Sequence, residues 1–135
     1  MKNNFYLPPS ETPEELEIQT STLRLSAKCW GSPAGMPVLA FHGWLDNAAT
    51  FDHLAPCLKE FRLVSIDLPG HGLSEHRSSS SSYHFSDMIV EMLEVLDVLG
   101  WHRFSLLGHS MGAGVASYLA GTIPEKIKSV ILIEG

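Results

Sequence analysis

The sequence predicts an α/β fold: a mostly parallel β-sheet with helices on both faces, preceded by an N-terminal antiparallel hairpin. Two observations support this prediction. Apolar and polar side chains alternate along residues 16–21 and 22–30, and this period of two is typical of paired strands with one face in a core. After the hairpin, short apolar runs alternate with segments of helical spacing, which is the order of strand–helix–strand units in a parallel sheet.

The composition is that of a globular domain and argues against several classes of partner. The chain has 135 residues, of which 44% are hydrophobic and 18% charged, enough apolar material to build a core. The net charge is −6, and the nine Lys and Arg residues are scattered. Because no basic stripe is available to neutralise phosphates, we expect no nucleic-acid partner.

Targeting and metal signals are also missing from the sequence. No apolar run approaches the roughly 20 residues of a membrane span, and the N-terminus lacks the apolar segment of a secretory signal, so we expect a cytoplasmic protein without a membrane span. Cys29 and Cys57 form no metal or redox spacing and are expected to be reduced thiols, with no metal site.

The first half of the chain is expected to contain an irregular lead-in, two buried strands and one helix. Residues 1–15 are rich in Pro, Ser and Glu, so the domain is placed at 16–135. The apolar runs at 38–41 and 61–67 predict strands buried on both faces. Between them, a helix is predicted over 50–59, because its apolar residues form one stripe: Phe51, Leu54, Ala55 and Leu58.

The second half continues the alternation of helices and strands. The Gly- and Ser-rich segment 67–84 predicts a long loop, and such loops are usually functional or mobile. A helix is predicted over 86–99, with Ser86 as its N-cap and Gly100 as its stop signal. The remaining predicted elements are a strand at 103–109, a helix at 111–121 and a last strand at 127–134.

The motif GHSMG, residues 108–112, lies between a predicted strand and a predicted helix. A serine at such a junction occupies a tight, strained turn, and Gly108 and Gly112 provide the space that the turn needs. The helix would begin directly after Ser110, so its N–H groups and positive end would face a developing oxyanion. This context predicts Ser110 as a nucleophile and the Met111 N–H as one oxyanion donor.

Two further loops are expected to meet this turn at the same edge of the sheet. The segment His42-Gly43-Trp44 leaves the strand at 38–41, and we assign the second oxyanion donor to the Trp44 N–H. His42 is expected to support this loop by hydrogen bonding. Asp67 is expected to tie the loop that follows it to its own strand end.

Together, three segments resemble the α/β-hydrolase family. FHGW at 41–44 is similar to its oxyanion loop, DLPGHGLS at 67–74 to its loop after the fourth strand, and GHSMG to its nucleophile turn. HGWLDN at 42–47 is most similar to the serine hydrolase-like proteins of that family. The resemblance implies a partial α/β-hydrolase fold, strands 1 to 6, without the cap and the last strands.

The resemblance also implies a chemistry. A serine at position 110, rather than an aspartate, points toward acyl transfer on a small-molecule ester, thioester or similar acyl compound, and away from the haloalkane dehalogenase and epoxide hydrolase branches. This esterase-like chemistry needs no cofactor. The resemblance implies that the acyl-enzyme forms at Ser110 and that the Met111 and Trp44 N–H groups form the oxyanion hole.

The catalytic triad departs from the family pattern. In the family the order is nucleophile, acid and then histidine, but no histidine follows Ser110 in this sequence. Glu134 ends the last strand and is either the acid or an exposed end residue. His109 is interpreted as structural, and His71 is the best in-chain candidate for an improvised base.

Two main hypotheses therefore stand for the chain as a whole, and a third is an unstable remnant without a function. One is the front part of a serine hydrolase whose base comes from elsewhere. The alternative is a catalytically silent fragment, or a binding chain that another polypeptide completes at the edge of the strand at 127–134, where an apolar strand invites pairing.

Overall fold

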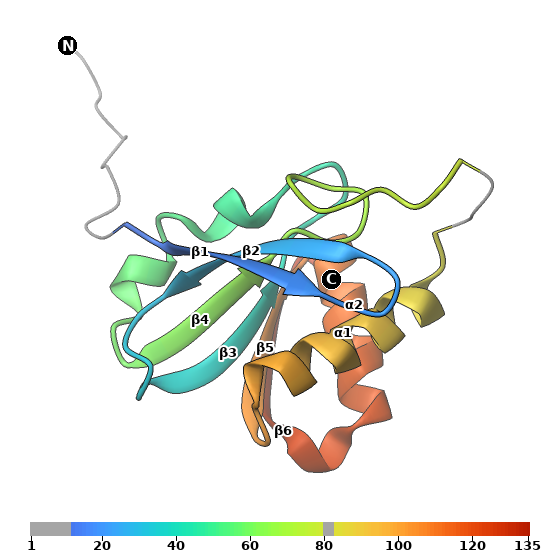
Figure 1. The fold of residues 1–135 in the computed structure, drawn as a ribbon. Coiled ribbons are helices and arrows are strands. Elements are labelled where there is room, and N and C mark those ends of the chain that lie inside the picture. The colour runs from blue at the N-terminus through green and yellow to red at the C-terminus, as the bar shows by residue number, and fades with distance from the viewer. Residues whose placement is uncertain (1–11, 80–82) are drawn as a thin grey trace.

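A single six-stranded sheet organises the chain in the computed structural model, which describes residues 12–79 and 83–135 (Figure 1). The strand order is β1-β2-β4-β3-β5-β6. In chain order the strands are β1 (Glu14–Gln19), β2 (Arg24–Trp30), β3 (Met36–Phe41), β4 (Phe61–Ile66), β5 (Phe104–His109) and β6 (Ile127–Ile133).

The pairing within the sheet confirms the predicted fold class. β1 pairs with β2, and β2 with β4, in antiparallel register. The pairs β3·β4, β3·β5 and β5·β6 are all parallel. Because β3 lies between β4 and β5, the carboxyl ends of these three parallel strands meet at one edge, where the loops that follow them come together.

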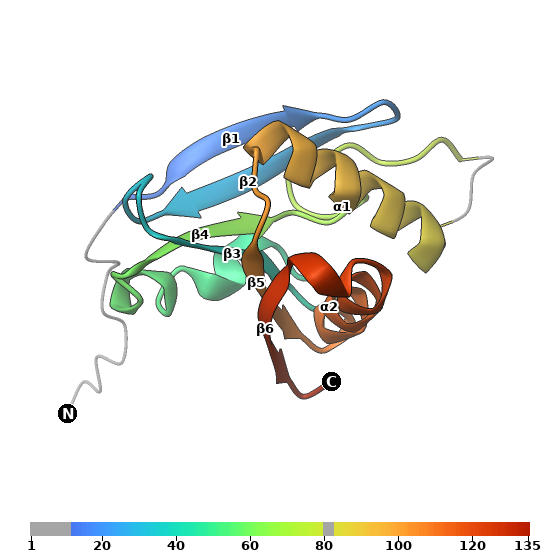
Figure 2. The same cartoon turned by 90° about the horizontal axis from the view of Figure 1, so that it is seen from below.

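Two layers of helix cover the sheet, one on each face (Figure 2). The α-helices α1 (Phe85–Leu99) and α2 (Met111–Thr122) pack on one face in the larger core. The other face carries two short 3-10 helices, η1 (Ala48–Phe51) and η2 (Ala55–Cys57), over a smaller core. The prediction of helices on both faces is thus confirmed, although only short 3-10 helices cover the second face.

The central strands are buried on both sides, as their continuous apolar runs predict. Along β3, Leu39 and Phe41 face the α-helices, whereas Val38 and Ala40 face the 3-10 helices. Alternate residues of one strand thus fill two different cores. A polar interruption here would leave an unpaired group in one core or the other.

The predicted helix over 50–59 is wrong. Two 3-10 helices occupy this region, and the second has Pro56 in its first turn. Proline has no N–H and its ring clashes with a preceding carbonyl, so it cannot continue an α-helix from residue 50. The Asn47 side chain caps the first 3-10 helix by accepting from the Ala49 N–H. The apolar stripe therefore marked a buried segment and not an α-helix.

Several element boundaries also differ from the predictions. The N-cap of α1 is His84, with no side-chain cap hydrogen bond, so the prediction of Ser86 was wrong; Gly100 ends the helix in a left-handed conformation (φ 69°), as predicted. β1 begins at Glu14, inside the predicted lead-in. The lead-in's residues 1–11 lie outside the described residues.

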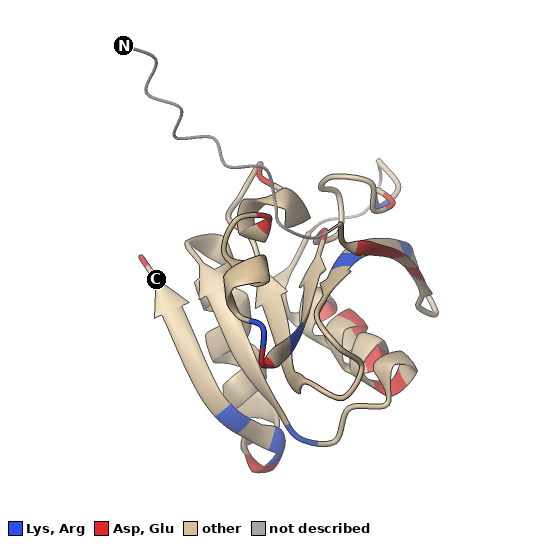
Figure 3. Ribbon diagram, turned by 90° about the vertical axis from the view of Figure 1, so that its left-hand side faces the viewer, with Lys and Arg blue, Asp and Glu red and all other residues tan. Residues whose placement is uncertain are grey.

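The described part of the chain has no continuous basic stripe, no membrane-spanning helix and no metal-binding cluster. Lys and Arg occur singly on several elements and form no continuous stripe there (Figure 3). Among the described helices, none has the length and apolar character to cross a membrane. Within residues 12–79 and 83–135, no cluster of His, Cys, Asp and Glu is arranged to hold a metal ion.

The last strand, β6, forms one edge of the sheet. Within the described chain it pairs only with β5. Its apolar side chains remain substantially exposed: Val130 37%, Ile131 56%, Leu132 47% and Ile133 40%.

Candidate active site

Ser110 stands at the sharp turn between β5 and α2. Its backbone angles are φ 54° and ψ −118°, a conformation that non-glycine residues rarely adopt and that needs support from surrounding structure. The Ser110 N–H donates to the Ile133 carbonyl over 3.0 Å, and the Ser110 carbonyl accepts from the Ala113 N–H over 2.9 Å. β6 and the first turn of α2 thus hold a strained serine that is itself exposed.

The two glycines of the motif allow the strand and the helix to pack closely. A Cβ on Gly108 would lie 2.4 Å from the Gly112 carbonyl oxygen, and one on Gly112 would lie 2.2 Å from the Phe41 carbonyl oxygen. No side chain fits at either distance. The glycines therefore serve two contacts, β5 against α2 and α2 against the end of β3.

The loop after β3 lies beside the serine. A Cβ on Gly43 would be 3.3 Å from the Ser110 Cβ. Met111 is the first residue of α2, so its N–H has no carbonyl partner within the helix. Trp44, the residue after Gly43, and Met111 line the same pocket. The two segments predicted to supply the oxyanion donors are thus brought together, and their roles as donors stay a prediction.

His42 connects this loop with the loop after β4. It is fully buried. Its Nδ1 lies 2.6 Å from the Gly43 carbonyl oxygen, and its Nε2 accepts from the Leu68 N–H over 3.0 Å. Because a carbonyl only accepts and an N–H only donates, these partners select the neutral imidazole with the proton on Nδ1. Burial lowers the pKa of His42 below its ordinary value, in agreement with a neutral ring.

Asp67 organises the loop after β4. Its carboxylate accepts from the Ala48 N–H over 2.7 Å and from the Leu73 N–H over 3.0 Å, while its carbonyl accepts from the Ser74 hydroxyl over 2.5 Å. Gly72 has a φ of 51°, and a Cβ there would collide with the carboxylate. Through these hydrogen bonds, Asp67 joins the loop after β4 to the end of its own strand.

The remaining sequence-selected residues form contacts with groups other than the serine hydroxyl. The His71 Nδ1 lies 3.0 Å from the Pro69 carbonyl oxygen, and the His71 ring is centred 5.0 Å from the His42 ring. The His109 Nε2 lies 3.5 Å from Glu134 Oε2, and the Glu134 side chain is 82% exposed. Among the described residues no hydrogen bond joins Ser110 to a histidine, and the acid candidate contacts the histidine that we interpreted as structural.

A cavity of about 310 Å³ opens beside Met111, at the start of α2. It is lined by Trp44, Leu45 and Met111, by residues of the loop after β4, and by Phe85 and Met88 at the start of α1. The loop residues include Pro69, His71, His76 and Tyr83. This volume is at the lower end of the range of small-molecule sites, about 300–1,000 Å³. The walls are mainly apolar.

Sequence reasoning missed a buried ion pair behind this cavity. Arg77 in the loop after β4 binds Glu91 of α1, whose side chain is 3% exposed. A glutamate between Met88 and Met92 on the apolar face of the helix was the signal available in the sequence, since a buried carboxylate needs a partner. Its partner, 14 residues away in the chain, had no local signal.

Comparisons with known proteins support the fold described above. The family model for the α/β hydrolase fold matches residues 36–135. A serine hydrolase-like protein of Dictyostelium discoideum is 43% identical over 125 residues, which is 90% of this chain and 35% of that protein.

Two solved structures also match. A hypothetical protein of Pseudomonas aeruginosa is 50% identical, with a TM-score of 0.85 over 89% of this chain and 43% of its own. The thioesterase domain from the curacin biosynthetic pathway is 33% identical, with a TM-score of 0.83 over 90% of this chain and 46% of its own. The chain thus spans less than half the length of each of these three proteins. It belongs to the α/β-hydrolase fold family.

Proposed function

We propose that this chain carries the nucleophile half of a serine hydrolase site, which acts on a small-molecule ester, thioester or similar acyl compound. The observation that carries the proposal is the strained, exposed Ser110 (φ 54°) at the start of α2. Strain of this kind persists only where the surroundings enforce it, and it clusters at functional sites. The likeness to serine hydrolase-like proteins and to a thioesterase domain supports acyl chemistry.

The proposed reaction begins with attack of the Ser110 hydroxyl oxygen on the substrate carbonyl carbon, while a base takes the hydroxyl proton. The carbonyl oxygen becomes an oxyanion, which the Met111 and Trp44 N–H groups stabilise. The intermediate then collapses, and the leaving group departs with a proton from the base. Water hydrolyses the acyl-serine in a second round of the same steps.

We place the general base outside these 135 residues. Three features support this: no histidine follows Ser110, no histidine bonds to Ser110 among the described residues, and the matched relatives are much longer than this chain. Glu134, at the end of β6, is proposed as the acid. Its present contact with His109 would have to give way to the incoming histidine.

Labelling with a fluorophosphonate tests the proposal, because such probes modify only activated serines. We expect the 135-residue chain to label slowly, at a rate several orders of magnitude below that of a complete triad, and Ser110→Ala not to label at all. His71→Ala and His109→Ala are expected to label at the rate of the unaltered chain. Equal labelling of Ser110→Ala and the unaltered chain would refute Ser110 as the nucleophile.

A second candidate function rests on the exposed apolar edge at β6. Here the chain is a catalytically silent or binding unit, which another polypeptide completes by adding a strand beside β6. Sedimentation distinguishes the candidates: a strictly monomeric chain that retains Ser110 labelling contradicts this one, whereas a stable complex without labelling supports it.

A further inference from the structure

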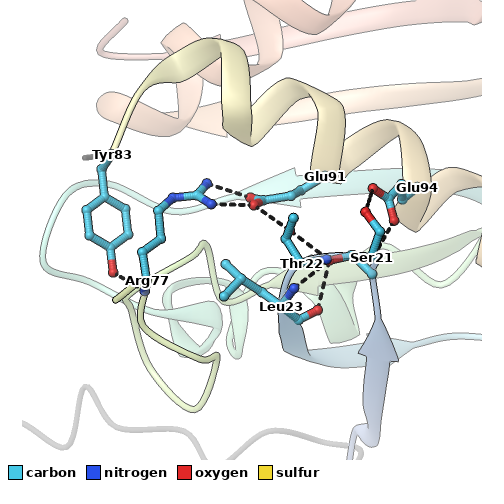
Figure 4. Close-up of polar contacts among 8 residues, drawn as sticks. Ser21, Thr22, Leu23, Arg77, Tyr83, Glu91 and Glu94 are labelled. Atoms are coloured by element: carbon cyan, nitrogen blue, oxygen red, sulfur yellow. Dashed lines mark hydrogen bonds and ion pairs between the residues drawn. The ribbon is translucent and has the colours of Figure 1, made fainter. Parts of the chain in front are cut away.

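The loop after β4 is fastened to α1 by a pair of opposite charges. Two guanidinium nitrogens of Arg77 bind the two carboxylate oxygens of Glu91, over 2.6 and 2.9 Å (Figure 4). The side chains are only 10% and 3% exposed. Glu91 also accepts from the Thr22 hydroxyl over 3.1 Å. This geometry is bidentate and directional, so it fixes the position of Arg77 as well as its charge.

Arg77 in turn holds Tyr83. The Arg77 backbone N–H donates to the Tyr83 hydroxyl over 2.7 Å, and the guanidinium lies 5.3 Å from the centre of the Tyr83 ring, within the range of a cation–π contact. Figure 4 shows the tyrosine standing beside the arginine. Tyr83 is therefore held at both its ring and its hydroxyl, although it is 44% exposed.

The other side of Tyr83 faces the proposed substrate site. A Cβ on Gly70 would lie 2.8 Å from the Tyr83 hydroxyl oxygen and 3.0 Å from its ring, so the ring packs directly on the loop beside His71. Tyr83 lines the cavity together with Phe85 and Trp44. The chain of contacts thus runs from Glu91 through Arg77 to one wall of the cavity.

The charge of this region is balanced before any ligand binds. Among the described residues that line the cavity, none is Asp, Glu, Lys or Arg. The nearby cation, Arg77, is paired with Glu91, and the whole chain has a net charge of −6. A carboxylate in this cavity would lose its water and find the imidazole rings of His71 and His76 as polar partners, but no Lys or Arg among the described lining residues to form an ion pair, which is unfavourable.

We propose that Arg77 and Glu91 are positioning residues which fix Tyr83 as a wall of the acyl cavity, and that the cavity selects acyl groups with an uncharged apolar tail. The inference rests on the proposed function, because it names the substrate class of the same site. It adds a specificity-determining residue, Tyr83, and the pair that holds it.

Binding of two non-reactive amides tests the proposal without requiring catalysis. Octanamide has an uncharged tail, and suberamic acid has the same amide and chain length but a carboxylate at the far end. Trp44 lies in the cavity wall, so its fluorescence reports binding, with Trp44→Phe as the control for the signal. We expect octanamide to bind at least about tenfold more tightly than suberamic acid at pH 8.

Variants of the positioning residues test whether Arg77 and Glu91 hold Tyr83 in the cavity wall. Removal of Arg77 alone would leave Glu91 buried without its partner, so the double variant Arg77→Met/Glu91→Gln is used, which removes both charges at similar volume. We expect it to weaken octanamide binding about tenfold, and Tyr83→Ala to have the same effect, because both open one side of an apolar pocket. Tyr83→Phe retains the ring and is expected to bind within about twofold of the unaltered chain.

The same helix offers a matched control. Glu94 accepts hydrogen bonds from the Ser21 N–H and hydroxyl over 2.6 and 2.7 Å, so it too joins α1 to the β1–β2 turn, but it has no contact with Tyr83 (Figure 4). Glu94→Gln is expected to leave binding unchanged. A purely structural role for Arg77 and Glu91 would weaken binding equally with and without the Tyr83 ring. A positioning role predicts no further loss from the double variant in a Tyr83→Ala background.

The outcomes separate this inference from the proposed function. Equal binding of the two amides overturns the selectivity, and unchanged octanamide binding in the folded double variant overturns the positioning role. An absence of octanamide binding to the unaltered chain overturns both the selectivity and the positioning role. Both tests are made on the unaltered chain: octanamide binding without any fluorophosphonate labelling would count against Ser110 as the nucleophile and not against the cavity.

Discussion

β5 and β6 are neighbouring parallel strands with similar apolar sequences and very different surroundings. The β5 residues Phe104, Leu106 and Leu107 are 1%, 0% and 3% exposed, whereas Ile131 and Leu132 of β6 are 56% and 47% exposed. β5 is flanked by strands on both edges and covered on both faces, while β6 has one flanking strand within the described chain. An apolar run thus predicts a strand that needs burial, but not what covers it.

The difference also bears on the turn at Ser110, which follows β5 and is hydrogen-bonded to the end of β6. Ser110 follows β5 and its N–H bonds to Ile133 at the end of β6. The strained turn therefore depends partly on the less protected strand. Whatever covers β6 is expected to stabilise the proposed active site as well.

The largest effect is expected where β5, α2 and β3 meet. In Gly112→Ala the new Cβ would lie 2.2 and 2.5 Å from the carbonyl oxygens of Phe41 and His42, so backbone atoms must move. We expect a loss of about 4 kcal/mol in the free energy of unfolding, measured by urea denaturation. The matched control is Gly121→Ala in the same helix, where nothing lies within 4 Å of the added atom and a gain of about 0.5–1 kcal/mol is expected. Equal effects of the two substitutions would contradict the close-packing interpretation.

A direct comparison of the two strands comes next. Leu106→Ala empties a fully buried site in β5 and is expected to lower the free energy of unfolding by about 3 kcal/mol. Ile131→Ala in β6 removes a similar volume from an exposed site and is expected to lower it by less than about 1 kcal/mol. If urea denaturation gave the two variants similar losses, β6 would be buried in solution by self-association.

A smaller effect is expected from His42 as the pH changes. Burial lowers the His42 pKa in the folded chain, so below the unfolded pKa of about 6.5 the unfolded chain binds more protons. This contribution to stability is therefore fully present above that pH and is lost as the pH falls. Between pH 7.5 and 5.5, the free energy of unfolding of His42→Gln should fall less steeply than that of the unaltered chain, by up to about 1.4 kcal/mol per pH unit. Parallel pH profiles would show that His42 is not held neutral.

The smallest expected change in stability concerns the edge itself. Ile131→Lys places a charge on the exposed face of β6 and is expected to change the free energy of unfolding by only about 0.5 kcal/mol. It should nevertheless reduce self-association, because charged side chains disfavour edge-to-edge pairing. Sedimentation velocity at increasing concentration measures this. Unchanged self-association would show that the chain associates through another surface, for example the one around the exposed Tyr118 of α2.

Much of the fold followed from local patterns. Each of these patterns spans only a few consecutive residues: the alternation in β1 and β2, the apolar runs of β3 to β6, and the glycine that ends α1. The structure confirms these elements. The helix expected over 50–59 failed because its apolar stripe is compatible with any buried segment, and Pro56 prevents an α-helix there. The stripe was a correct signal of burial and a wrong signal of conformation.

The candidate site divides in the same way. The residue types and spacing of GHSMG were sufficient to predict a strained serine turn, and the structure has Ser110 at φ 54°. The Arg77–Glu91 pair and the fixed position of Tyr83 were not predicted, because an ion pair between a loop and a helix leaves no periodic pattern in either segment. The contact of Glu134 with His109 was likewise invisible to motif reasoning.

By itself, the sequence determined the order of strands and helices, the two glycines that permit the turn at Ser110, and the apolar character of β6. These features depend on backbone conformation and on the periodicity of neighbouring residues. Only the tertiary structure decided that His42 is a neutral link to Leu68, 26 residues away, that Glu91 is paired with Arg77, and that β6 is exposed. Each of these depends on which distant groups share a buried space, because removal from water makes a polar group seek a partner wherever the fold brings one within reach.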